Sequence, residues 1–174
     1  YGIYIETSTG YSVEENLFSG KYPGDYGNIG LYISNSGTDP NQVYRNQFSH
    51  LPYGIVAYGV NRAETGEGLC LKCNNFDYCL NDIHVIPEKD EYGNWLRGRN
   101  QGIAFAQGGG GSDIAPGGNA FTDKEIFQQT FNYFNHENCN MIDYHYHRYP
   151  PPGVITKPDP RSEAMVHLSP EDVD

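Results

Sequence analysis

A chain of 174 residues is long enough to bury one continuous core and fits a single domain. Its 21 Gly and 15 Tyr, together with a mean hydropathy of -0.64, favour turns and half-exposed strands over a helical bundle. The net charge of -11 argues against nucleic-acid partners, and no apolar run approaches the roughly 18 residues that membrane insertion needs.

The acidity is typical of a protein that stays soluble outside the cell, so we expect an extracellular or cell-surface location. The chain begins at Tyr1 inside a strand pattern, with neither an initiator Met nor a signal peptide. This start suggests a processed or excised piece of a larger secreted protein.

A first phrase, in which a small or polar residue precedes apolar-x-apolar, recurs along the chain. Its copies are Gly2–Ile5, Gly30–Ile33, Gly54–Ala57, Asp82–Val85 and Gly102–Phe105, with a degenerate copy at Asn140–Tyr144. Apolar residues at every second position predict strands that bury one face.

A second phrase, apolar-x-x-Asn-x-Phe, lies between copies of the first. It occurs at Val13–Phe18, Val43–Phe48 and Leu71–Phe76, and its end is preserved at Asn119–Phe121. Successive copies are 24 to 30 residues apart as far as Asp82–Val85 in the first phrase and Leu71–Phe76 in the second. A period of this length, built from strands and turns, predicts a solenoid.

Each conspicuous residue of the second phrase has a structural role in such a coil. Asn tolerates the left-handed conformation that a sharp corner requires, and stacked Asn side chains about 4.8 Å apart can form a hydrogen-bonded ladder. The Phe two residues later points to the same side and can stack in the same way. The predicted ladder comprises Asn16, Asn46, Asn74 and Asn119 with Phe18, Phe48, Phe76 and Phe121.

The interleaved phrases resemble the right-handed parallel β-helix repeat proteins, the pectin-lyase-like architecture, in the style of secreted and cell-surface repeat proteins of the Bacteroidota. The resemblance covers residues 1–107 well and 117–147 loosely. It implies an all-β solenoid of about five to six coils over residues 1–148, regular to 107 and irregular over 108–148.

Four segments depart from the repeat. Residues 87–100 hold charges, turns and the only Trp, which predicts an extruded loop, and residues 107–119 are Gly-rich and predict a flexible loop or tight turn. Residues 122–131 predict a short helix or a bulged strand. Residues 149–174 are Pro-rich and predict an extended strap or linker.

The cysteines and histidines are candidate metal ligands. Three cysteines form a C-x2-C-x5-C pattern that lacks a fourth zinc ligand, so one or two disulfides or buried free thiols are preferred. His145 and His147 alternate on one predicted strand, with His136 upstream, and a polar strand face is preferred over a metal site. We expect no metal and no cofactor. The cysteines are Cys70, Cys73, Cys79 and Cys139.

The outward positions of the first strand column suggest a binding surface. They are predicted to be Tyr4, Tyr32, Val56, His84 and Ala104, without the carboxylates that a calcium-dependent lyase needs. Tyr4, Tyr32, Tyr58 and His84 would form an exposed aromatic track that could contact sugar rings. The competing interpretation is that Tyr is simply a good strand former.

These patterns favour a non-catalytic extracellular module for adhesion, carbohydrate contact or structural spacing. One alternative is a fragment of a polysaccharide lyase or glycoside hydrolase that uses loop carboxylates. Another is a self-assembling fibre subunit, because the open ends of a solenoid present unpaired strand edges that could associate with one another.

Overall fold

The computed structural model describes residues 1–21, 27–98, 100–108, 117–123, 131–160 and 165–171. These residues form an all-β parallel solenoid of about five turns, without a helix, so the predicted fold class is confirmed. Within the same residues, no helix is long and apolar enough to cross a membrane.

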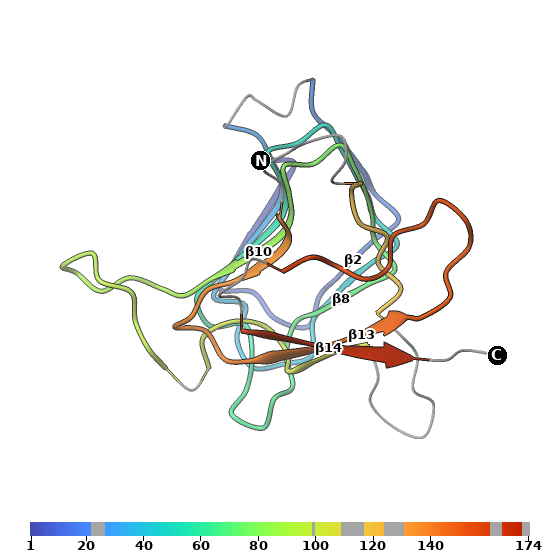
Figure 1. Ribbon diagram of the computed structural model, residues 1–174. Coiled ribbons are helices and arrows are strands. Elements are labelled where there is room, and N and C mark those ends of the chain that lie inside the picture. The colour runs from blue at the N-terminus through green and yellow to red at the C-terminus, as the bar shows by residue number, and fades with distance from the viewer. Residues whose placement is uncertain (22–26, 99, 109–116, 124–130, 161–164, 172–174) are drawn as a thin grey trace.

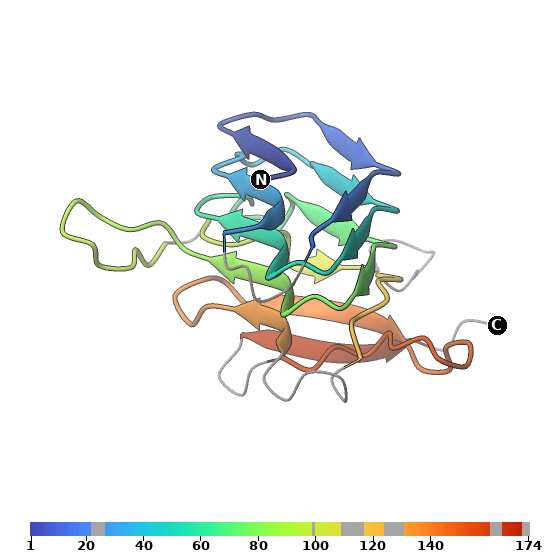
Figure 2. The same ribbon diagram turned by 90° about the horizontal axis from the view of Figure 1, so that it is seen from above.

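Four parallel sheets form the walls of the solenoid, which Figure 1 shows in projection and Figure 2 from the side. The largest sheet has the order β1 (Ile3–Glu6), β4 (Ile29–Ser34), β7 (Tyr53–Tyr58), β10 (Asn81–Ile86) and β12 (Phe131–Asn135). The second contains β2 (Ser12–Glu14), β5 (Gln42–Tyr44) and β8 (Cys70–Lys72). The third contains β3 (Leu17–Ser19), β6 (Gln47–Ser49) and β9 (Asn75–Asp77), and the fourth contains β11 (Ala106–Gln107), β13 (Ile142–His147) and β14 (Val166–Glu171).

The register follows the sequence period through the first four coils. Ile3 pairs with Leu31, Leu31 with Ile55, and Ile55 with Ile83. The inward residues of β4, β7 and β10 at these positions are fully buried, and the alternate residues face outward. The core is therefore one apolar column that runs along the solenoid axis.

The corner residues of the second phrase stack from coil to coil. The Nδ2 of Asn16 donates to the Oδ1 of Asn46 at 3.0 Å, and the same contact joins Asn46 to Asn74 and Asn74 to Asn119 at 3.1 Å. The Phe rings stack beside them, with centroid distances of 4.8 Å from Phe18 to Phe48, 5.1 Å from Phe48 to Phe76 and 6.0 Å from Phe76 to Phe121.

The expectation that these Asn residues take the left-handed conformation is wrong. The residue before each Asn takes it instead, with φ of 57° at Glu15, 55° at Arg45, 55° at Cys73 and 65° at Gly118. The corner therefore divides two tasks between neighbours: one residue carries the strained backbone, and the Asn side chain satisfies backbone groups.

The prediction that the fifth copy of the first phrase, Gly102–Phe105, adds a strand to the first column is also wrong. Residues 102–105 do not join the largest sheet; its fifth strand is β12, which pairs with β10, and Phe134 lies opposite His84. Ala104 is 3% exposed and is not an outward position of that sheet. The degenerate copy at Asn140–Tyr144 overlaps β13, which belongs to the fourth sheet. The hairpin and the Gly-rich segment that precede β12 break the period, so local spacing no longer gives the register.

The remaining segments differ from the expectations in specific ways. Residues 87–98 form an extruded hairpin, drawn in yellow-green in Figure 1, in which Lys89 bridges Trp95 in antiparallel fashion. The Pro-rich tail lies against the solenoid: Ile155 O accepts the N–H of Phe121, and β14 adds a parallel strand to β13. Most of the Gly-rich segment (109–116) and of the proposed helix (124–130) lies outside the described residues.

Candidate functional site

A cluster of tyrosines lies on the outer face of the largest sheet. The rings of Tyr4 and Tyr32 stack at 5.3 Å with an interplanar angle of 10°, and Tyr32 stacks on Tyr58 at 6.4 Å. Tyr1 contacts Tyr4 and Tyr32 at 5.4 and 5.3 Å in tilted geometry. Tyr1 is 67% and Tyr4 49% exposed, whereas Tyr32 and Tyr58 are half-buried, so this tyrosine cluster (Tyr1, Tyr4, Tyr32 and Tyr58) opens to solvent at its Tyr1 and Tyr4 end.

The strand register explains why His84 does not extend this cluster. Tyr4, Tyr32, Val56 and His84 occupy one column, and Val56, which is 4% exposed, separates Tyr32 from His84. Tyr58 lies two residues further along β7 and pairs with Ile86. The four residues expected to form one track are thus divided between two groups.

His84 belongs to a second group of rings. It stacks on Phe134 at 4.6 Å and meets Tyr53 edge-on at 5.3 Å. His136 contacts Phe134 at 6.1 Å and the Trp95 ring at 5.0 Å. This histidine cluster (Tyr53, His84, Trp95, Phe134 and His136) lies on β7, β10 and β12, on the hairpin, and at the residue that follows β12.

The hairpin connects the two clusters. The Tyr58 hydroxyl accepts the backbone N–H of Lys89 at 3.0 Å, and the Lys89 ammonium lies 4.2 Å from the centroid of the Trp95 ring. Asp90 holds the hairpin turn by accepting the N–H groups of Tyr92 and Asn94. We call the two clusters together the aromatic surface.

Tyr4 and Tyr32 of this surface remain neutral over the physiological pH range, because both have a raised phenol pKa. Burial, and then the neighbouring phenols of Tyr1, Tyr4 and Tyr58, raise the pKa of Tyr32 to about 12. Partial desolvation and the carboxylate of Glu6 also raise the pKa of Tyr4. Because Tyr4 and Tyr32 stack face to face, their hydroxyls and ring edges are the groups that a ligand would meet.

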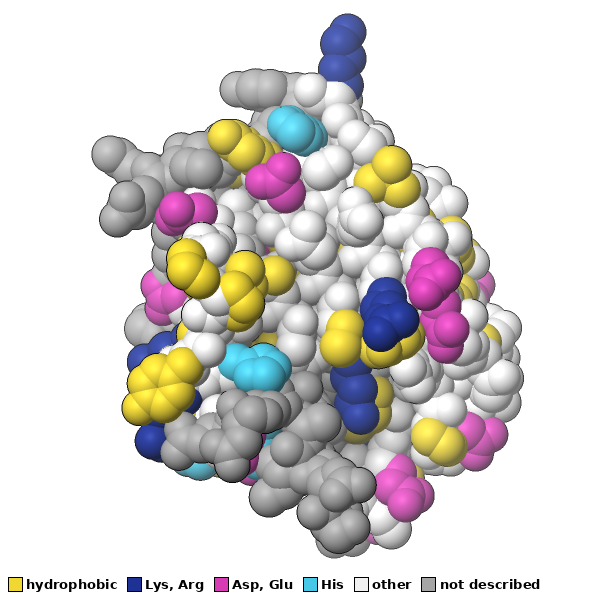
Figure 3. Space-filling model, turned by 90° about the vertical axis from the view of Figure 1, so that its right-hand side faces the viewer, with side chains coloured by type: hydrophobic (Ala, Val, Ile, Leu, Met, Phe, Trp, Pro, Cys, Tyr) yellow, Lys and Arg dark blue, Asp and Glu magenta, His cyan; other side chains and the backbone are white. Residues whose placement is uncertain are grey.

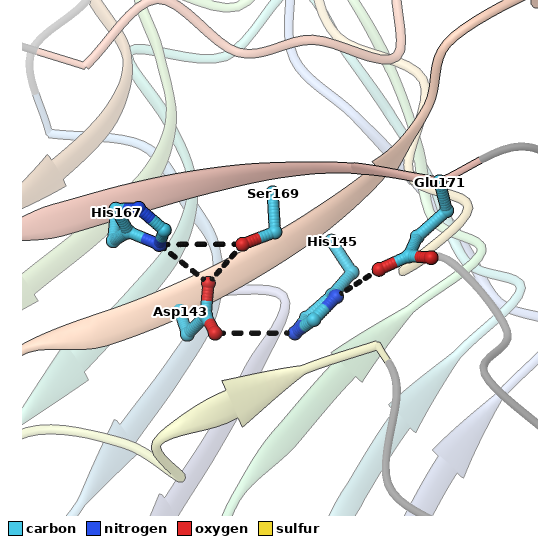
Figure 4. A network of polar contacts seen from close by, with 5 residues as sticks. All are labelled: Asp143, His145, His167, Ser169 and Glu171. Atoms are coloured by element: carbon cyan, nitrogen blue, oxygen red, sulfur yellow. Dashed lines mark hydrogen bonds and ion pairs between the residues drawn. The ribbon is translucent and has the colours of Figure 1, made fainter. Parts of the chain in front are cut away.

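Apart from the aromatic surface, a cluster of polar side chains joins β13 to β14 (Figure 4). One oxygen of Asp143 contacts the Nδ1 of His167 at 3.0 Å and accepts the Ser169 hydroxyl at 2.7 Å. Its other oxygen lies 3.3 Å from the Nε2 of His145, whose Nδ1 meets Glu171 at 2.5 Å. With a proton on both ring nitrogens, His145 would donate a hydrogen bond to Asp143 and to Glu171 at once; with a proton on one nitrogen, it would donate to only one of them.

This polar cluster holds the residue types of a Ser-His-Asp relay but not its geometry. In such a relay the acid and the hydroxyl contact opposite nitrogens of the ring. Here Asp143 and Ser169 both contact Nδ1 of His167, at 3.0 and 3.2 Å, and also contact each other. The arrangement cannot pass a proton from the hydroxyl through the ring to the carboxylate, and it serves to fasten β14.

The charge of Asp143 depends on this fastening. Burial acts to raise the pKa of its carboxyl, but the hydrogen bonds from Ser169 and His167 and the nearby His145 outweigh burial and lower it. The Asp143 carboxylate therefore stays ionised, and continues to accept hydrogen bonds from β14, at pH values below the usual pKa range of an aspartate.

The four cysteines are free thiols. A bond between Cys70 and Cys73 is excluded because β8 is extended: three residues of strand span about 10 Å, beyond the roughly 7 Å that a disulfide bridges. Cys79 and Cys139 are buried, and burial raises the pKa of the Cys139 thiol to about 12. Among the described residues, no group of three His, Cys, Asp or Glu side chains is placed to hold a metal ion.

Side chains of opposite charge meet at the corner that follows the second sheet. Glu15 and Arg45, on neighbouring coils, lie 3.8 Å apart and are both more than half exposed, so their ion pair contributes little to stability. On the face that Figure 3 shows, acidic and basic side chains lie side by side among scattered hydrophobic ones and form no extended basic area.

Comparison of the chain with protein-family models, with curated proteins and with solved structures gives no match. The fold and the sites themselves define the class of protein, a parallel β-solenoid with an aromatic outer face. The sequence pattern missed Phe134, Trp95 and His136 as members of that face; the single Trp in an inserted loop was the one available signal. It also missed Ser169 and Glu171, since they follow a Pro-rich segment taken for a strap or linker.

Proposed function

We propose that this chain is a non-catalytic module of a secreted or cell-surface protein, and that its aromatic surface contacts a linear polysaccharide. The observation that carries the proposal is the stacked row of Tyr4, Tyr32 and Tyr58 along the largest sheet. Coils about 4.8 Å apart repeat the phenol groups along the axis, and a linear glycan repeats its hydroxyls in the same manner.

The chemistry of the row supports contact through hydroxyls and ring edges. Tyr1 and Tyr4 are exposed, and their phenol hydroxyls can both donate and accept hydrogen bonds. The outward column of this sheet carries rings and Val56 in place of carboxylates. This composition favours binding over acid-base cleavage at this surface.

Affinity electrophoresis against a panel of neutral and acidic polysaccharides tests the proposal. The unmodified chain should be retarded by at least one of them. Tyr32→Phe keeps the stacked ring and removes the hydroxyl, and should weaken the binding up to about tenfold, the effect of one lost hydrogen bond. Tyr149→Phe is the matched control, because Tyr149 is 81% exposed and lies outside the aromatic surface.

Two results would contradict the proposal. If no polysaccharide in the panel retards the chain, or if Tyr32→Phe and Tyr4→Phe bind as well as the unmodified protein, the surface does not bind glycans in this way. If incubation releases new reducing ends or unsaturated sugars, the chain is a hydrolase or lyase, and the non-catalytic assignment fails.

A further inference from the structure

The two ends of the solenoid differ. Among the described residues, β1, β2 and β3 at the N-terminal end each pair on one side only, with β4, β5 and β6. All three walls of the first coil therefore present an unpaired strand edge in the same direction, as the upper end of Figure 2 shows. Exposed parallel edges with apolar residues between them are surfaces that proteins normally cover.

The C-terminal end is covered by the chain itself. The Nδ2 of Asn119, at the end of the ladder, donates to the Tyr144 hydroxyl at 3.2 Å. Ile155 O accepts the N–H of Phe121, and Pro160 bridges Tyr133. The chain itself thus supplies at Asn119, Phe121 and Tyr133 the partners that a further coil would otherwise supply.

The ladder has a direction, and the direction shows what the open end lacks. The Oδ1 of Asn46 accepts both the backbone N–H and the Nδ2 of Asn16, and the Oδ1 of Asn74 accepts the same two groups of Asn46. Asn119 receives the corresponding pair from Asn74. Within the described ranges, no donor reaches the Oδ1 of Asn16, so the ladder begins with an unfilled acceptor.

Apolar groups lie beside that acceptor. Phe18 begins the ring stack and, in the part of the chain that the structure describes, stacks on one ring, that of Phe48. A hollow at this end is lined by Phe18, Leu17, Gly2 and Leu51, and Leu17 is 70% exposed. The open end therefore offers, in register, a hydrogen-bond acceptor, a ring face and three strand edges.

We propose that the N-terminal end of the solenoid binds one more parallel coil of the same repeat. The corner Asn of that coil donates its N–H and Nδ2 to Asn16 Oδ1, and its Phe stacks on Phe18. The contact continues the interface that already joins the first coil to the second and the second to the third.

A second copy of this chain fits the end less well. In a head-to-tail pair, the incoming surface would be the C-terminal end, which is covered by the tail and whose Asn119 already donates to Tyr144 and to Leu71 O. In a head-to-head pair, two unfilled Asn16 acceptors would face each other without a donor. Neither arrangement supplies the missing hydrogen bonds.

The experiment presents the coil in line, because a single coil has no core of its own and does not fold alone. A second copy of residues 29–52 is placed directly ahead of Tyr1 in the full chain. Ile29 pairs with Tyr53 and Leu31 with Ile3, so this junction keeps the native register. The added copy's Asn46 then lies over Asn16, and its Phe48 lies over Phe18.

Hydrogen exchange of the backbone amides of β1, β2 and β3 is the readout. Exchange in these strands should slow about tenfold in the extended protein, because an added coil suppresses fraying of the first one. The matched control carries Asn46→Ala in the added copy alone and should lose most of the slowing. Unchanged exchange in the extended protein would overturn the proposal.

A second extension guards against a failure of the first to fold. Residues 53–80, placed ahead of Tyr1, bring Asn74 and Phe76 to the same two positions. If both extended proteins fail to fold while the unmodified chain folds, the end does not accept a coil. Sedimentation equilibrium of the unmodified chain tests the remaining occupant. If the chain self-associates, and exchange in β1–β3 is slower in the associated form than in the monomer, the occupant is a second copy and the proposal is wrong.

Discussion

Removing one Asn from the middle of the ladder should destabilise the protein far more than removing the first. The Asn46 side chain is fully buried, and its Oδ1 accepts two groups of Asn16, each at 3.0 Å. Its Nδ2 donates to Val13 O at 2.8 Å and to Tyr44 O and Asn74 Oδ1 at 3.1 Å. Asn46→Ala leaves these buried groups without their partners.

The structure sets the size of the difference. With a net contribution of about 1 kcal/mol per hydrogen bond, and more where a buried partner is left unsatisfied, Asn46→Ala should cost about 3–5 kcal/mol. Asn16 is only half-buried and makes two side-chain donations, to Glu14 O and to Asn46 Oδ1. Its main loss on truncation is these two bonds, so Asn16→Ala should cost about 1 kcal/mol.

Urea denaturation followed by circular dichroism measures both free energies of unfolding. Gln47→Ala is the control, because Gln47 lies next to the corner and is exposed. A loss of stability for Asn46→Ala no larger than that for Asn16→Ala would refute the ladder as a main source of stability. A loss at Gln47 equal to that at Asn46 would show that the corner responds to any truncation.

Three further outcomes follow from buried or clustered groups. Burial raises the pKa of the Asp82 carboxyl from 3.8 to about 7, so the stability that this group contributes is full below pH 4 and is lost as the pH rises towards 7. Asp82→Asn should therefore make the free energy of unfolding less dependent on pH over that range, as measured by denaturation at successive pH values. Native-state maleimide labelling should modify the exposed Cys73 quickly and the buried Cys79 only on unfolding, and equal rates would contradict the described burial. Asp143→Ala should speed hydrogen exchange in β14 and leave exchange in β4 and β7 unchanged. In the unmodified protein, exchange in β14 should also become faster as the pH falls through the lowered pKa of Asp143, because the ionised carboxylate that holds β14 is then protonated.

The first four coils could be predicted because their information is local. Each carries the same alternation, as at Leu31 and Ile83, and a fixed period places equivalent residues over one another without knowledge of the rest of the chain. The fifth strand of the largest sheet could not be predicted in this way. Phe131–Asn135 lacks the first phrase and follows two insertions, so its partner is set by tertiary packing and not by spacing.

The site divides in the same manner. Tyr4 and Tyr32 are one period apart, so the sequence alone predicts that they lie in one column. The contacts of Trp95 with Lys89 and His136 depend on how a hairpin folds back on itself and against the sheet. The spacing of a sequence repeat does not specify the direction in which a hairpin folds. For the same reason it does not predict that the Pro-rich tail returns to the solenoid and pairs β14 with β13.

The open end and the aromatic surface meet at Tyr1, and this meeting gives a last prediction. In the extended protein, the Tyr32 of an added copy of residues 29–52 would lie over Tyr4, in the region where the Tyr1 ring now rests 5.4 Å from it. Tyr1 would have to move, and the stacked row would gain one phenol at the coil spacing. If the row binds a linear glycan, the extended protein should bind it up to about tenfold more tightly than the unmodified chain.

Affinity electrophoresis of the two proteins side by side measures that gain. Tyr32→Phe in the added copy alone should remove the gain and leave the slowed hydrogen exchange of β1–β3 intact, because the exchange depends on the coil and the affinity depends on the hydroxyl. An extended protein with slowed exchange and unchanged affinity would separate the two proposals: the coil interface would stand, and glycan contact along the tyrosine row would fail.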